Sequence, residues 1–137
     1  MAMTRFWAAA ALACGVVPAA AEAQTWRQAA RGDSGTEYID TDSIVRSGET
    51  VRYSRETRLF RPDRVSSGIR YDTLAVDYRA DCTRRTHNAL RTTARLKGVT
   101  IISFTAEEAG GEDEQKALPG SVAEGVLNAV CDGEWEG

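Results

Sequence analysis

The chain has 137 residues, of which 42% are hydrophobic and 27% charged, and its formal net charge is −3. This length suits one ordinary domain, and the charge balance gives no indication of a nucleic-acid partner. One histidine and three cysteines do not supply the convergent ligands of a metal site, or the nucleophile, base and orienting group of a catalytic triad. We therefore expect no catalytic residue, no cofactor, no metal and no enzymatic activity.

The N-terminus has the three parts of a secretory signal peptide. A positively charged start is followed by an apolar stretch, Phe6–Ala21, and then by a small-residue triplet that ends at Ala23. We expect cleavage between Ala23 and Gln24, which divides the chain into a signal peptide over 1–23 and one exported domain over 24–137.

Two other interpretations of the N-terminal segment remain open. A membrane anchor needs roughly 20 strongly apolar residues, whereas this stretch is mostly alanine and is broken by Gly15 and Pro18. Cys14 follows a short apolar run that resembles a lipobox, in which the cysteine would be lipidated and become the new terminus. No later apolar run approaches spanning length, so we expect no transmembrane segment in the mature chain.

Export determines the expected state of the two cysteines of the mature chain. An exported protein meets an oxidising compartment, where paired thiols usually form disulfides. Removal of Cys14 with the signal leaves Cys82 and Cys131, for which only one intramolecular pairing exists. Closing a loop of this length stabilises a fold by about 4 kcal/mol in the loop-entropy model.

The first part of the mature chain predicts strands separated by turns. Turn residues at 32–35 precede a short strand over 36–44, and a second turn surrounds Gly48. Side chains of residues 50–60 alternate between two faces, and the face expected to point inward carries Val51, Tyr53, Thr57 and Leu59. Such a period of two is typical of a half-buried strand. Residues 62–68 are expected to form a polar loop.

Three more strands are expected in the middle of the chain. The segment 71–82 alternates most regularly and places Leu74, Val76, Tyr78, Ala80 and Cys82 on the buried face. The threonine-rich segment 84–97 is ambiguous by propensity, and its neighbours favour a strand. In that strand Leu90 and Leu96 should point inward, and Arg85, His87, Arg91 and Arg95 outward. Residues 99–105 form the next expected strand, and the glycine-containing segment 107–116 an acidic loop.

The period changes at the C-terminus. Ser121 and Glu124 have the spacing of a capping box, and the apolar residues that follow recur at helical intervals up to Cys131. Gly133 is a plausible helix stop. Strands followed by one packed helix predict a single α+β domain, a twisted antiparallel sheet of about five or six strands with a C-terminal helix. The disulfide would then hold this helix against the central strand.

Charge is distributed unevenly along the chain. Arginines dominate the middle, and carboxylates dominate the sequence after residue 107. Opposed segments of this kind indicate internal pairing first and a partner second. If the outward arginines share a face, Arg85, Arg91 and Arg95 are a candidate site for an anionic partner. The alternative is that Glu56, Asp77 and Asp81 neutralise this face by cross-strand pairing.

Several short segments, in this order, resemble one family. They are Trp26, Glu37-Tyr38-Ile39-Asp40, Arg46-Ser47-Gly48, Tyr78-Arg79-Ala80-Asp81-Cys82, Pro119-Gly120-Ser121-Val122 and Ala129-Val130-Cys131. Together they are similar to the surface-adhesin protein E-like family of bacterial envelope proteins. The resemblance implies a twisted antiparallel sheet tied to a C-terminal helix, a non-enzymatic role, and a location in the periplasm or at the outer surface.

Two classes of function follow from the sequence. The first is a surface or periplasmic binding module whose partner is a protein or a polyanion at the cell envelope. The second is a structural envelope protein that self-associates, for example as a homodimer, or assembles with other envelope components.

Overall fold

The structure, a computed structural model, describes residues 24–136. The signal segment, with Cys14 and Ala23, lies outside the described residues, so the expected cleavage and the alternative lipidation stay predictions. Within the described part no helix is long and apolar enough to cross a membrane.

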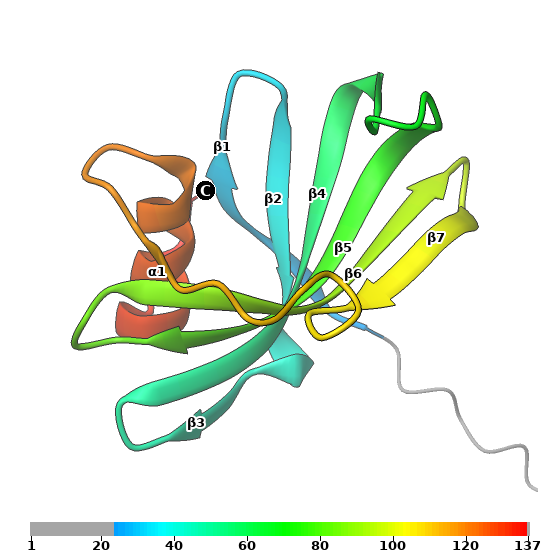
Figure 1. The fold of residues 1–137 in the computed structure, drawn as a ribbon. Helices are drawn as coiled ribbons and strands as arrows, with labels where there is room; N and C mark the ends of the chain where they lie inside the picture. Colours follow the sequence, from blue (N-terminus) through cyan, green and yellow to red (C-terminus); the bar gives the residue numbers. More distant parts are fainter. Residues whose placement is uncertain (1–23, 137) are drawn as a thin grey trace, which may run out of the picture.

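Eight strands form one antiparallel sheet. They are β1 (Trp26–Arg31), β2 (Gly35–Asp40), β3 (Val45–Ser47), β4 (Thr50–Arg64), β5 (Arg70–Asp81), β6 (Thr86–Leu96), β7 (Val99–Thr105) and β8 (Gln115–Lys116). The strand order is β1-β2-β4-β5-β6-β7, while β3 pairs with β4, and β8 pairs with β6. The sheet is strongly twisted, and the long hairpin of β4 and β5 runs through its middle (Figure 1).

Alternation along β4 divides the sheet into two faces. Val51 and Tyr53 are buried beneath the helix, as the sequence predicted, whereas the intervening Arg52 is exposed. We call the face that carries Tyr53 the inner face, and the opposite one the outer face. Opposite β4, the inner face is continued by Tyr78 and Ala80 of β5.

One helix, α1 (Val122–Asp132), packs on the inner face. Ser121 is its N-cap and accepts a hydrogen bond from the backbone N–H of Glu124, and Gly133 ends it in the left-handed conformation. Both helix boundaries were predicted correctly. Val126 and Leu127 are fully buried. The helix lies so close to β1 that a Cβ atom added at Gly125 would lie 3.0 Å from the Cβ of Ala30.

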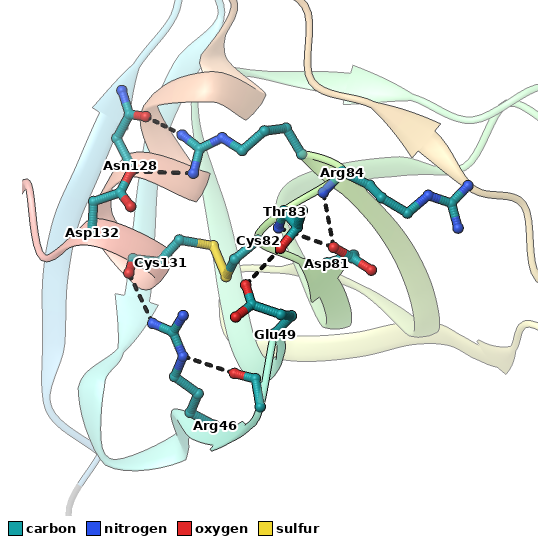
Figure 2. Close-up of a disulfide and its surroundings, with 11 residues drawn as sticks. Arg46, Glu49, Asp81, Cys82, Thr83, Arg84, Asn128, Cys131 and Asp132 are labelled. Atoms are coloured by element: carbon teal, nitrogen blue, oxygen red, sulfur yellow. Dashed lines mark hydrogen bonds and ion pairs between the residues drawn. A yellow bond between two sulfur atoms is a disulfide. The ribbon is translucent and has the colours of Figure 1, made fainter.

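The Cys82–Cys131 disulfide is present, with a Cα–Cα distance of 5.7 Å and a sequence separation of 49. Cys82 begins the turn after β5, and Cys131 lies in the last turn of α1. Figure 2 shows the bridge together with Arg46, whose guanidinium donates to the backbone carbonyl of Cys131 at 3.0 Å. The expected link between the central strand and the helix is therefore confirmed.

The prediction of five or six strands is wrong, because the sheet has eight. The sequence did not predict β1, β3 and β8. β3 has three residues and β8 two, too few to show a period. β1 is longer but contains a β-bulge between Gln28 and Ala30, so adjacent Ala29 and Ala30 are both buried and the alternation is lost.

Candidate functional site

The outer face of the sheet is lined by polar side chains from β4, β5 and β6. Neighbours across the strands bring Ser54, Asp77 and Arg91 into one row, and Arg58, Thr73 and Arg95 into another. Between these rows, opposite Thr93, lies the short side chain of Ala75. The face is therefore hollowed between two rows that both end in an arginine.

A hollow of about 220 Å³ lies on the outer face between these rows. Its lining includes Trp26, Asp77, Arg91, Thr93 and Arg95. Arg91 and Arg95 are four residues apart on one strand, so their Cα atoms are separated by about 13 Å at the usual strand rise. Both therefore border one depression on the outer face.

The carboxylates of the outer face do not all pair with its arginines. Glu56 accepts from Arg58 at 2.9 Å and lies 3.7 Å from Arg95. Asp77 accepts from the Ser54 hydroxyl at 2.7 Å. Among residues 24–136, Arg91 forms no ion pair and is exposed. Cross-strand neutralisation is thus only partial, and Arg91 is left with its charge facing solvent.

Arg85 does not belong to this face. It lies in the turn between β5 and β6 with a φ of 55°, and its guanidinium pairs with Asp132 of α1 at 3.1 Å and with the amide oxygen of Asn128. Figure 2 shows Asn128 and Asp132 on the helix side that faces this turn. The expectation that Arg85 shares a strand face with Arg91 and Arg95 is wrong, since the strand begins only at Thr86.

His87 was expected on the solvent side, and this is also wrong. A β-bulge in β6, opposite Asp77 and Tyr78, inserts Leu90 and reverses the alternation, so His87 lies on the inner face and Arg91 on the outer one. The imidazole stacks on Tyr78 with ring centroids 5.0 Å apart. Burial lowers the pKa of His87, and the positive charge of Arg55 lowers it further.

The arginines at the β5–β6 end of the sheet are used internally. Arg79 pairs with Glu112 at 2.5 Å, and Arg84 pairs with Glu114 at 2.8 Å. These contacts, with that of Arg85, confirm the expectation that the basic middle and the acidic C-terminal part pair with each other. The acidic segment also contains β8, so it is not only a loop.

The sequence did not predict a cluster of aromatic and arginine side chains beside the hollow. The Arg58 guanidinium lies 4.0 Å from the ring centroid of Tyr38 and 5.8 Å from that of Trp26. Cation–π contacts of this kind are worth about 0.5–1 kcal/mol at exposed sites. The alternation placed Arg58 on the outer face, but the aromatic partners come from β1 and β2, whose register the sequence does not reveal.

A metal site requires several ligands that converge on one point. Residues 24–136 contain no group of three or more His, Cys, Asp or Glu side chains that could hold a metal. The hollow on the outer face presents charged and hydroxyl groups that can bind, and its arrangement suits recognition of an anion.

Comparison with known proteins assigns the family. The surface-adhesin protein E model matches residues 26–132. The chain belongs to the surface-adhesin protein E family. No curated protein matches this chain.

Solved structures show the same fold. This member of the surface-adhesin protein E family is similar to protein E from non-typeable Haemophilus influenzae, with a TM-score of 0.56 at 11% identity, over 85% of this chain and 82% of that chain. Crystal form II of Haemophilus influenzae protein E gives a TM-score of 0.54 at 13% identity, over 71% of this chain and 80% of that chain. Identities this low show the shared fold alone.

Proposed function

We propose that this chain is an exported, non-enzymatic binding module of the bacterial cell envelope. The observation that carries the proposal is the match of the surface-adhesin protein E model to residues 26–132. An adhesin-like module needs an accessible surface and no reacting groups, and the open sheet face described above suits that role. The module is expected to act in the periplasm or at the outer surface.

The outer face is the part of the module that we assign to the partner. Arg91 is exposed, and Arg95 lies at 3.7 Å from a carboxylate that Arg58 already holds at 2.9 Å. Exposed ion pairs contribute only about 0–1 kcal/mol each, so a dense anion can displace such a pair. The partner is thus a polyanion, or a protein that presents an acidic patch.

Heparin chromatography of the mature protein tests this assignment. A variant with Arg91→Gln and Arg95→Gln should elute at lower salt than the wild type. The matched control, Arg61→Gln with Arg64→Gln, removes the same charge at a distant turn and should elute close to the wild type. Retention should weaken steeply above roughly 0.15 M salt, where the Debye length is about 8 Å. Equal elution of the two variants would contradict the assignment to the outer face.

Self-association is a second candidate, favoured by the edge strand β7. This strand pairs only with β6, and its sequence, VTIISFT, contains no charge. Val99, Ile101 and Ile102 are exposed on it. An uncharged edge strand with exposed apolar side chains is a template for pairing with another chain. A second copy of β7 is the partner that this interpretation requires.

Light scattering over a range of protein concentrations separates the two candidates. Self-association predicts a mass that rises with concentration without ligand, and Ile101→Lys should abolish the rise. Leu118→Lys, at a more exposed apolar residue outside the sheet, is the control and should leave it unchanged. A constant monomer mass, with salt-sensitive heparin retention, would favour the binding module alone.

A further inference from the structure

Three turns meet at the end of the sheet that lies far from the disulfide. The backbone N–H of Phe60 donates to the carbonyl of Ser34 in the β1–β2 turn at 2.9 Å. The N–H of Lys97, in the β6–β7 turn, donates to the carboxylate of Asp72 in β5 at 2.9 Å. Between them projects the β4–β5 turn, and Figure 1 shows the three turns along one end of the sheet. We call the segment Phe60–Arg70 the hairpin tip.

Large apolar side chains are exposed at this end. Phe60 is 50% exposed and Ile69 38% on the hairpin tip, and Val99 is 63% exposed at the start of β7. The register of β4 against β5 is irregular between Arg58 and Asp63, so the residues around Phe60 leave the regular ladder. A hollow of about 510 Å³ lies between this irregular segment and the β1–β2 turn.

The arginines of the hairpin tip have no carboxylate partners. Arg61, Arg64 and Arg70 are exposed, and no ion pair within residues 24–136 includes them. Asp63 accepts from the backbone N–H of Arg64 at 2.7 Å, and Asp72 accepts from that of Lys97. Arg79, Arg84 and Arg85, near the opposite end of the sheet, instead pair with carboxylates. The hairpin tip therefore carries three arginines against one carboxylate, Asp63, and within residues 24–136 no ion pair neutralises these arginines.

Protruding apolar side chains flanked by unpaired arginines fit one kind of partner, the surface of an anionic phospholipid bilayer. Guanidinium groups donate paired hydrogen bonds to phosphate oxygens. Apolar side chains exposed at a turn can be buried in a deformable apolar medium, which the boundary between headgroups and acyl chains supplies. Phe60, Ile69 and Val99 do not lie on the outer-face hollow. A water-soluble polyanion is therefore a sufficient partner for that hollow.

We propose that the hairpin tip docks onto an anionic phospholipid surface, with Arg61, Arg64 and Arg70 at the headgroup phosphates and Phe60 and Ile69 in the interface. This contact uses the turns at the end of the sheet and not the Arg91–Arg95 hollow itself, although Arg70 is only three residues from Thr73, which pairs with Arg95. The sheet would stand on the bilayer by its turns and leave the outer face free for another partner. Binding of this kind is reversible and weakens with salt, because basic residues act within a Debye length of the surface.

Sedimentation of the mature protein with lipid vesicles tests the proposal. Vesicles of phosphatidylcholine with phosphatidylglycerol should bind the protein, and phosphatidylcholine alone should not. Each arginine near such a surface changes affinity about fivefold, so Arg61→Gln with Arg64→Gln should weaken binding by about 25-fold. The charge-matched control, Arg91→Gln with Arg95→Gln, should bind these vesicles as the wild type does.

The apolar contribution has its own test. On addition of phosphatidylglycerol vesicles, the tryptophan emission of Phe60→Trp should shift to the blue more than that of the wild type. The reason is that the new indole would enter the interface. Phe60→Ser with Ile69→Ser should weaken binding while the arginines remain.

Three results would overturn the docking proposal. The first is that the wild type does not bind the anionic vesicles, and the second is that the two arginine variants bind them equally. The third is that changing the tip arginines reduces heparin retention while the protein binds no vesicles. The last would mean that the tip binds a soluble polyanion. If the two arginine variants eluted equally from heparin while the wild type still bound vesicles, only the Arg91–Arg95 assignment would fail. The two proposals are therefore distinguishable.

Discussion

The Nε of Arg55 lies 2.7 Å from the carboxylate of Glu37, and both side chains are almost completely buried on the inner face. Thr57 donates to the same carboxylate oxygen at 2.6 Å, and the Arg55 guanidinium lies 5.0 Å from the ring centroid of Tyr78. The carboxylate comes from β2, and the groups around it come from β4 and β5. The ion pair therefore connects β2 with β4, and the contact of Arg55 with Tyr78 extends this connection to β5.

Removing the acid should destabilise the fold strongly. Glu37→Ala would leave the Arg55 charge buried without its counterion, and such a change usually costs about 3–5 kcal/mol. Replacing both residues by methionine should cost much less, since neither charge is then left alone. Urea unfolding measures both variants. Glu112→Ala breaks the exposed pair with Arg79 and should cost at most about 1 kcal/mol, and an equal cost at both sites would contradict the importance of burial.

The disulfide makes a large contribution to stability. Replacing Cys131 by serine should lower the free energy of unfolding by about 2–4 kcal/mol, because the unfolded chain gains freedom when the loop is opened. Reduction of the wild type should give a similar loss in urea unfolding, and the Cys82→Ser, Cys131→Ser double variant should not respond to the reductant. Rapid alkylation of both cysteines in the native protein would show that the bond does not form.

The N-cap of α1 can be tested separately from the disulfide. In Ser121→Ala the N–H of Glu124 loses the hydroxyl that it contacts at 3.2 Å, and loss of an N-cap oxygen usually costs about 1 kcal/mol. Ser121→Asp keeps an acceptor and should preserve most of the stability. Thermal unfolding of the three proteins measures the difference. An unchanged midpoint for the alanine variant would mean that this hydrogen bond contributes nothing.

His87 should make stability depend on pH. Burial, and then the Arg55 charge, lower its pKa in the folded state below the ordinary 6.5. The unfolded chain therefore binds a proton first as the pH falls, and stability should be constant above this value and decrease below it. His87→Phe, which can still stack on Tyr78, should lose this part of the pH dependence in urea unfolding. An NMR titration midpoint of His87 above 6.5 would reverse the predicted sign.

Local patterns were sufficient for the regular parts of the fold. Alternation located β4 and β5, the β-branched and aromatic residues of 99–105 indicated β7, and capping residues located α1. Arg55 occupies the position between Tyr53 and Thr57 on the inward row, and the pattern alone gives no reason to expect a buried arginine there. Its counterion, Glu37, comes from another strand, and the sequence does not show which residues of β2 face β4.

The errors in the candidate site have one common cause, the irregularity of β6. A strict period of two makes His87 and Arg91 neighbours on one face, and it extends the strand back to Arg85. The inserted Leu90 reverses the faces after His87, and no glycine or proline marks the bulge. Arg85 adopts a left-handed conformation that few non-glycine residues adopt, so nothing local indicated that the strand begins one residue later.

The bond between Cys82 and Cys131 encloses the exposed segment 107–114, which lies between β7 and β8. A protease that cut this segment would produce two pieces that remain covalently joined. Such a nicked molecule would run as one species in a non-reducing gel and as two after reduction. Cleavage of this exposed segment therefore need not release α1 from the sheet, because the disulfide still joins the helix to the end of β5.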